Sequence, residues 1–162
     1  FKELFLTQFK VKLQQALFFL NHPLVIEQAR RLADKGQRVA LICYSHGLAS
    51  YLRRITADWS RRKQPGYVGE FHSLGIQWGA PQGPDENERT SQTSQFFEHD
   101  LPAAMKELAA DLPDGQRFDS IVIDEAQDFA DSWWDPVLAA LRGGAGLVTA
   151  ARLANGTPEM LN

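Results

Sequence analysis

The feature that most constrains this chain is a short apolar run that ends in two adjacent acids. Residues 120–124 (SIVID) are rich in β-branched side chains, a pattern typical of a strand buried in a parallel sheet. The run ends at Asp124 and Glu125. Because burying unpaired carboxylates is costly, we expect both acids to face a cleft, a cation or solvent. Since the chemistry of α/β proteins lies at the carboxyl ends of strands, the pair marks a candidate site.

The rest of the chain alternates between strand and helix patterns. Short apolar runs predict further strands at 38–43, 67–71 and 147–150. Helical patterns cover 1–20, 23–35, 48–58, 73–78, 96–110 and 132–141, and a long polar loop covers 79–94. Asn21 is the expected cap of the second helix, and Gly36 its end. Such alternation predicts one α/β domain over residues 1–162, with a parallel sheet and helices on both sheet faces.

Composition narrows the function classes. The chain has 162 residues and a formal charge of −3, so any nucleic-acid contact has to come from a local basic patch. Cys43 is the only cysteine, which excludes an intramolecular disulfide and a cysteine cluster for zinc and fits a cytoplasmic protein. The apolar runs near the N-terminus are shorter than the roughly 20 residues that span a bilayer, and no signal-peptide cleavage site follows them. We therefore expect no membrane partner.

The two adjacent acids suit a specific chemistry. A hard cation such as Mg²⁺ prefers oxygen ligands and retains several waters. One carboxylate can hold that ion or its waters, while the other orients or deprotonates an attacking water. The alternative is an ordinary turn between a strand and a helix, in which acidic residues cap the helix.

Four segments resemble a known family. Residues 124–129 (DEAQDF) resemble the Walker B motif of UvrD/Rep-like superfamily 1 DNA helicases. Residues 36–46 resemble the strand and loop called motif Ia, and residues 71–74 (FHSL) resemble motif Ib. Trp133-Trp134 resembles an aromatic pair that often follows Walker B in bacterial relatives. The resemblance covers residues 24–142 and implies the N-terminal RecA-like ATPase domain, a partial P-loop NTPase core.

The resemblance assigns roles around the nucleotide. It implies that Asp124 coordinates Mg²⁺, directly or through water, beside bound ATP. It implies that Glu125 positions the hydrolytic water and also lies at the nucleotide. It implies that Gln127 couples the nucleotide state to DNA. Glu125 and Gln127 are thus the catalytic residues that the family pattern suggests.

The resemblance also implies a contact surface for single-stranded DNA. Tyr44 and Ser45 would lie on the single-strand track, where an aromatic ring stacks on a base for roughly 1–3 kcal/mol. His72 and Ser73 would lie near the phosphate backbone. The residues alone leave alternatives open: Tyr44 as a partly buried core aromatic, and His72 as a structural histidine hydrogen-bonded between loops. The basic residues that could attract phosphates, or form a solvated basic face, are Arg53, Arg54, Arg61, Arg62 and Lys63.

The chain departs from the family pattern at the phosphate loop. Relatives have Gly-x-x-x-x-Gly-Lys-Thr, whose amides and lysine cradle phosphates. The matching stretch, 15–22 (QALFFLNH), contains no glycine, lysine, threonine or serine. Pro23 removes a further amide donor. Glu70 replaces a threonine that contacts phosphate in relatives, and no motif III glutamine follows the last predicted strand. The second RecA-like domain, with its arginine finger, is missing from this chain.

Two functional hypotheses agree with these features. The chain is a fragment or degenerate copy of a UvrD/Rep-like ATP-dependent DNA helicase, inactive alone, or a nucleotide-independent single-strand nucleic-acid-binding or regulatory module that has lost ATPase activity. The divergent ends, 1–22 and 143–162, reflect either a truncated or frame-shifted reading frame or a genuine remnant. A different ATPase with a coincidental acid pair agrees less well with motifs Ia and Ib. A metal hydrolase is disfavoured because the four histidines lack metal-ligand spacing.

Overall fold

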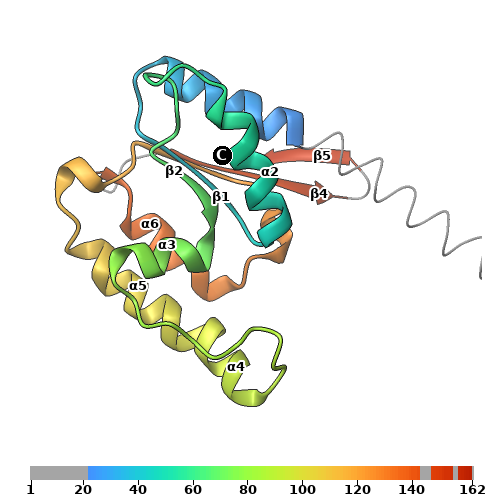
Figure 1. The fold of residues 1–162 in the computed structure, drawn as a ribbon, viewed down its shortest axis with the longest axis vertical. Helices are drawn as coiled ribbons and strands as arrows, with labels where there is room; N and C mark the ends of the chain where they lie inside the picture. The colour runs from blue at the N-terminus through green and yellow to red at the C-terminus, as the bar shows by residue number, and fades with distance from the viewer. Residues whose placement is uncertain (1–21, 143–146, 155–156, 162) are drawn as a thin grey trace, which may run out of the picture.

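The chain forms a five-stranded sheet in the order β2-β1-β3-β4-β5 (Figure 1). The computed structural model describes residues 22–142, 147–154 and 157–161. In chain order the strands are β1 (Val39–Cys43), β2 (Tyr67–Glu70), β3 (Ser120–Ile123), β4 (Leu147–Ala154) and β5 (Thr157–Leu161). The predictions for residues 1–20 and for a cap at Asn21 lie outside the described residues.

Parallel pairing joins four of these strands. β1 lies between β2 and β3, with Ile42 opposite both Gly69 and Ile123. β4 pairs in parallel with β3, whereas β5 runs antiparallel to β4. The predicted α/β class with a parallel sheet is thus confirmed for these strands. The sequence patterns do not predict β5; it contains Pro158, and proline within a strand is restricted mainly to edges such as this one.

The helices agree with the sequence patterns in position but not at every boundary. A helix covers residues 22–34, and Gly36 follows it with a φ of 80°, the left-handed conformation expected at a helix end. The other α-helices are α2 (His46–Ala57), α3 (Phe71–Trp78), α4 (Ser91–Gln95), α5 (Leu101–Ala110) and α6 (Trp134–Ala139).

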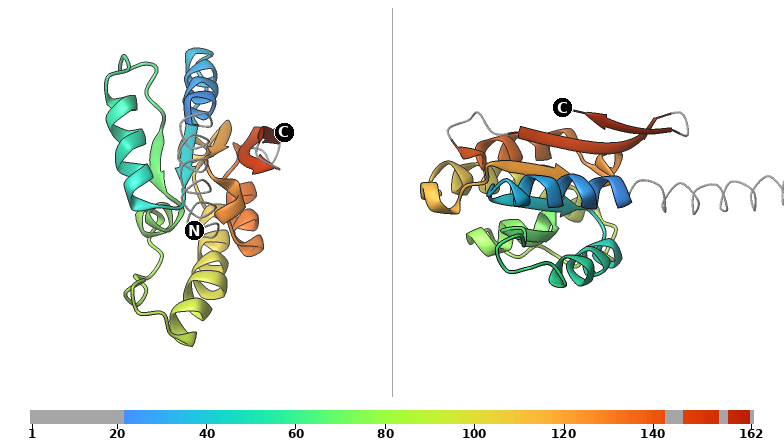
Figure 2. Two further views of the ribbon diagram at one scale, coloured as in Figure 1. Left: turned by 90° about the vertical axis from the view of Figure 1, so that its right-hand side faces the viewer. Right: turned by 90° about the horizontal axis from the view of Figure 1, so that it is seen from above.

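Helix α4 begins inside the predicted loop 79–94. Thr90 caps it by accepting a hydrogen bond from the backbone N–H of Thr93. A π-helical turn, Phe96–Asp100, then connects α4 to α5. This segment extends away from the sheet before α5 returns toward it (Figures 1 and 2). The observed loop is therefore shorter than predicted, because a local threonine cap initiates a helix within polar sequence.

Helices cover both faces of the sheet, as predicted. On one face, the helix over 22–34 and α2 pack on alternate strand residues such as Leu41 and Val122. On the other face, α3, α5 and α6 pack on the intervening residues such as Ile42 and Ile121 (Figure 1). This two-residue alternation follows from the geometry of a strand. No helix within the described ranges has the length and apolar character needed to cross a bilayer.

We predict that Phe71→Ala will destabilise the protein by about 3–5 kcal/mol, because it leaves a cavity in a closely packed core. Phe71 begins α3, is 1% exposed and stacks on Trp133 with ring centroids 4.8 Å apart. Urea denaturation measures the free energy of unfolding. As a matched control, Ile76→Ala on the same helix removes a side chain that is 44% exposed, and it should cost under about 1 kcal/mol. Equal losses from both variants would contradict the assigned core.

Candidate functional site at the carboxyl edge of the sheet

Three strands end at the same edge of the sheet. Cys43 at the end of β1 is opposite Glu70 at the end of β2, and Ile42 is opposite Ile123 at the end of β3. The residues that follow these strands therefore meet at one edge. The structure places there the end of the segment 36–46, from Tyr44 onward, and the segments that begin at Phe71 and Asp124.

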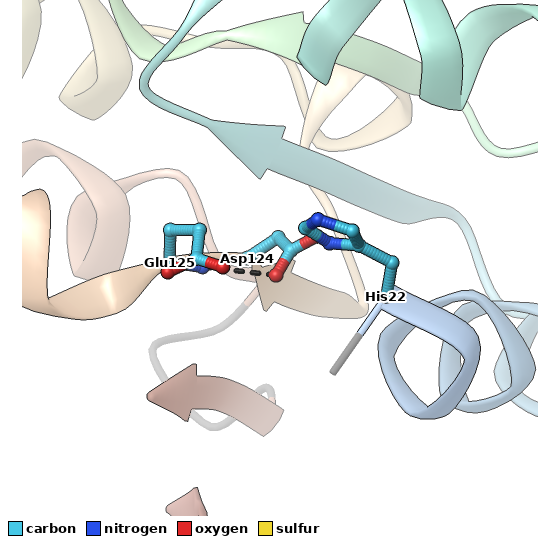
Figure 3. Close-up of side chains that lie close together, drawn as sticks. All are labelled: His22, Asp124 and Glu125. Atoms are coloured by element: carbon cyan, nitrogen blue, oxygen red, sulfur yellow. Dashed lines mark hydrogen bonds and ion pairs between the residues drawn. The ribbon is translucent and has the colours of Figure 1, made fainter. Parts of the chain in front are cut away.

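Asp124 is completely buried, which corrects the expectation that it faces a cleft, a cation or solvent. Its Oδ2 lies 2.5 Å from Nδ1 of His22, and its Oδ1 accepts the backbone N–H of Glu125 at 3.0 Å (Figure 3). His22 is itself only 2% exposed. A buried carboxylate is tolerated when it has such hydrogen-bond partners. In the sequence, His22 is only one of several scattered histidines.

Glu125 adopts an unusual backbone conformation beside Asp124. Its φ of 56° and ψ of 48° lie in the left-handed region, which side-chain-bearing residues rarely adopt. Its half-buried carboxylate accepts a hydrogen bond from Nε2 of Gln127. Burial raises the pKa of Glu125, while the hydrogen bond from Gln127 acts in the opposite direction. Glu125 and Gln127 thus interact with each other at the start of a 3₁₀ turn, Ala126–Asp128.

The donor set around Asp124 is only partly suited to Mg²⁺. Ligand atoms of His22, Asp124 and Glu125 all lie within 4.8 Å of one another. Mg²⁺ prefers oxygen ligands and water, whereas an imidazole nitrogen suits ions such as Zn²⁺. Both Asp124 oxygens already accept or share hydrogen bonds inside the protein. Each oxygen keeps a second lone pair, so the assignment of Asp124 to Mg²⁺ stays a prediction of the resemblance.

Tyr44 lies at the surface of this edge: it is partly buried, as one alternative held, but it belongs to neither hydrophobic core. It is 45% exposed and stacks on Trp133, with ring centroids 5.7 Å apart and an interplanar angle of 29°. Trp133 is buried and in turn meets His72 edge-on at 4.8 Å. The sequence suggests Trp133 only through its resemblance to an aromatic pair. Its structural role is to connect the exposed ring to the core.

A cavity of about 680 Å³ lies beside Tyr44. Its aromatic lining residues are Tyr44, His72, Phe97, Phe129 and Trp133. Polar side chains from the segment 86–98, together with Asp128 and Ala130, complete the lining. A concave site with aromatic walls and a few polar groups has the general character of a ligand pocket.

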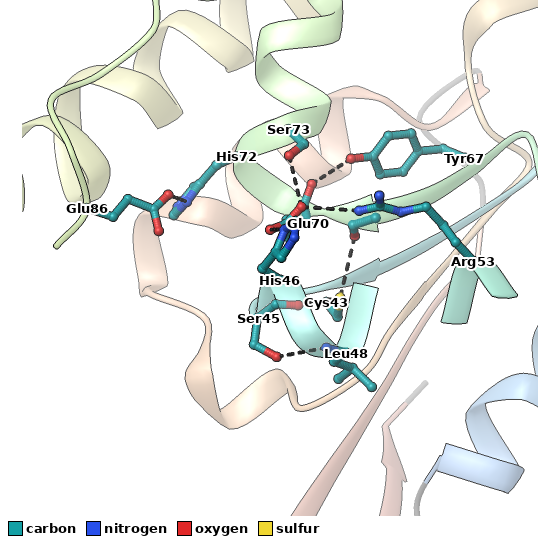
Figure 4. Close-up of polar contacts among 11 residues, drawn as sticks. Cys43, Ser45, His46, Leu48, Arg53, Tyr67, Glu70, His72, Ser73 and Glu86 are labelled. Carbon is teal, nitrogen blue, oxygen red and sulfur yellow. Dashed lines mark hydrogen bonds and ion pairs between the residues drawn. The ribbon is translucent and has the colours of Figure 1, made fainter. Parts of the chain in front are cut away.

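His72 is a buried histidine that links two segments. Its Nδ1 lies 3.0 Å from Oε1 of Glu86, a residue of the loop before α4 (Figure 4). This agrees with the alternative of a structural histidine, although the hydrogen bond joins the first turn of α3 to a loop and not two loops. Its Nε2 is buried without a hydrogen-bond partner among the described residues. Burial lowers the pKa of His72, and the Glu86 carboxylate opposes that change.

The hydroxyl groups of Ser45 and Ser73 are engaged within the protein. Ser45 caps α2 by accepting the backbone N–H of Leu48 at 3.3 Å, and Ser73 donates to Oε2 of Glu70 at 3.1 Å (Figure 4). Glu70 also contacts Nδ1 of His46 at 3.0 Å and accepts from Nη2 of Arg53 at 3.3 Å. The charge of Glu70 is therefore partly compensated locally.

Three of the five basic residues after β1 have a close neighbour within the protein. Arg53 pairs with Glu70, and Lys63 lies 3.1 Å from Asp34. The guanidinium of Arg54 lies over the ring of Tyr51. The two ion pairs reduce the local positive field, whereas Arg61 and Arg62 are exposed.

We predict that Glu86→Gln will lower the pKa of His72 further, because it removes the carboxylate that stabilises the imidazolium. An NMR titration of the His72 ring measures this value. Because the folded pKa lies below the unfolded one, the folded state binds fewer protons, and stability should fall as pH drops below about 6.5. Glu88→Gln in the same loop is the control and should leave the pKa of His72 unchanged. An unchanged value in Glu86→Gln would contradict the assigned contact.

Comparison with known proteins adds no family assignment. No family model, no curated protein and no solved structure matches this chain. The resemblance to UvrD/Rep-like helicases therefore rests on the four short sequence segments alone.

Proposed function

We propose that this chain is a degenerate first RecA-like lobe of a UvrD/Rep-like DNA helicase that binds single-stranded nucleic acid without requiring a nucleotide. In this proposal, the carboxyl edge of the sheet retains the surface that contacts single-stranded nucleic acid. The lobe does not hydrolyse ATP by itself, because residues 15–22, where relatives have the phosphate loop, contain no glycine, lysine, serine or threonine.

The observation that carries the proposal is the ring of Tyr44 at the sheet edge. It is exposed on one side and supported on the other by Trp133. A supported, exposed ring can stack on an unpaired base of any sequence. The neighbouring cavity has aromatic walls, including His72 and Phe97, and lies beside the same ring. The local chemistry thus favours contact with bases over contact with phosphates, since Ser45 and Ser73 are already hydrogen-bonded.

A second observation supports the loss of nucleotide binding. His22 belongs to the stretch that replaces the phosphate loop, and it contacts the buried carboxylate of Asp124. A histidine at this position provides neither the glycine backbone nor the lysine that triphosphates require. It also forms a hydrogen bond with Asp124, the acid that the family pattern assigns to Mg²⁺. In the proposed lobe, Asp124 of the Walker B segment therefore has a structural role as the partner of His22.

We expect Tyr44→Ala to weaken binding of a fluorescently labelled oligothymidylate by about 5-fold to 150-fold, which corresponds to the roughly 1–3 kcal/mol of one base stack. Fluorescence anisotropy at a fixed, low salt concentration measures the affinity. Leu138→Ala removes another exposed apolar side chain, on α6, and should leave the affinity unchanged. The proposal fails if the unmodified chain does not bind the oligonucleotide, or if Tyr44→Ala binds as tightly as the unmodified chain.

We expect neither the unmodified chain nor Glu125→Gln to bind Mg-ATP at micromolar concentrations, because the amides and lysine of a phosphate loop are missing from the sequence. Isothermal titration calorimetry measures binding, and a phosphate-release assay measures hydrolysis. An intact ATPase site would show a different pattern, in which both proteins bind nucleotide but only the unmodified one hydrolyses it. That pattern would show that the lobe is an active ATPase, and it would contradict the proposed loss of nucleotide binding.

A further inference from the structure

A small cavity lies at the opposite, amino edge of the sheet. It has a volume of about 260 Å³. Arg38 precedes β1, Tyr67 begins β2 and Phe118 precedes β3, and all three line it. The cavity therefore lies across the sheet from the aromatic site, and its chemistry is independent of the proposed function.

The guanidinium of Arg38 is held in place in this cavity. It lies over the ring of Phe118, 5.3 Å from the ring centroid, a distance typical of a cation–π contact. On another side it packs against the backbone of Gly66. A Cβ atom at residue 66 would lie 3.0 Å from Cγ and 3.1 Å from Cζ of Arg38. The glycine thus leaves the space that the arginine side chain occupies.

Within the described ranges, no acid pairs with the guanidinium of Arg38. Its Nε is buried without a hydrogen-bond acceptor there, and none of the residues that line the cavity is acidic. The neighbouring acid, Asp119, is engaged elsewhere. Its Oδ2 accepts the backbone N–H of Arg38 at 2.7 Å, and its Oδ1 accepts from Nη1 of Arg142 at 2.7 Å. A buried donor without an acceptor is destabilising, so a ligand oxygen within reach of this guanidinium would be stabilising.

Further donors line the same cavity. The side-chain amides of Gln77 and Gln116 and the indole of Trp78 are among its lining groups. None of the three makes a side-chain hydrogen bond within the part of the chain that the structure describes. Guanidinium groups bind carboxylate and phosphate oxygens in a bidentate manner. We propose that this cavity binds the oxyanion group, carboxylate or phosphate, of a small ligand through Arg38. A volume of about 260 Å³ suits a ligand of a few heavy atoms.

The test is an NMR titration of the ¹⁵N-labelled full chain with sodium phosphate and, separately, with sodium succinate. Sodium chloride keeps the ionic strength constant and serves as the blank. The indole N–H signal of Trp78, assigned with Trp78→Phe, reports on the cavity. We expect a saturable shift with at least one of the two anions, and the anion that saturates identifies the ligand class. Arg38→Gln should weaken that binding about tenfold or more, because a charge-assisted hydrogen bond is lost.

Two further variants separate a specific site from general charge attraction. Arg61→Gln removes an exposed positive charge that does not line the cavity, and it should leave the affinity unchanged. Arg38→Lys keeps the charge but loses the planar fork, so it should still weaken binding, and it decides the question if Arg38→Gln does not fold. The proposal is overturned if neither anion saturates the shift, if Arg61→Gln weakens binding as much as Arg38→Gln, or if Arg38→Lys binds with unchanged affinity.

Discussion

The burial of β1 is the constraint on which the rest of the structure depends. All five residues from Val39 to Cys43 have no exposed surface, so their backbone groups need partners on both sides. β2 and β3 supply these partners in parallel pairing. Alternate side chains of β1 then enter the two cores on opposite faces of the sheet, which is why helices are required on both faces. The common direction of the three strands also creates one carboxyl edge and one amino edge.

Buried charge at the carboxyl edge imposes the next constraint. Asp124 follows β3 into a position with no solvent access, where an unpartnered carboxylate would be strongly destabilising. His22 provides the partner from 102 positions away in the sequence. The contact joins the helix over residues 22–34 to the end of β3. Asp124, which the sequence resemblance assigns to a cation, therefore links a helix to the sheet in this fold.

The two edges differ in how completely their charges are compensated. At the amino edge, Asp119 pairs with Arg142, whereas no acid lies among the described residues that line the cavity around the Arg38 guanidinium. Surface ion pairs contribute little to stability, but a partly buried charge without a counterion favours binding of a ligand of opposite charge. The two proposals therefore concern different chemistry: stacking on bases at the carboxyl edge and binding of an oxyanion at the amino edge. At the carboxyl edge, by contrast, the charge of Glu70 is compensated by Arg53 and by contacts with His46 and Ser73.

The sequence by itself determined which segments form β1 to β3 and that the acids after β3 mark a candidate site, because apolar runs predict buried parallel strands and sites form at their carboxyl ends. Only the tertiary structure decided what the side chains at these ends contact. The burial of Asp124 against His22, the support of Tyr44 by Trp133 and the engagement of the Ser45 and Ser73 hydroxyls could not be predicted from local patterns. Periodicity and capping depend on neighbouring residues, whereas the partner of a buried polar group comes from a distant segment whose position only the packed chain determines.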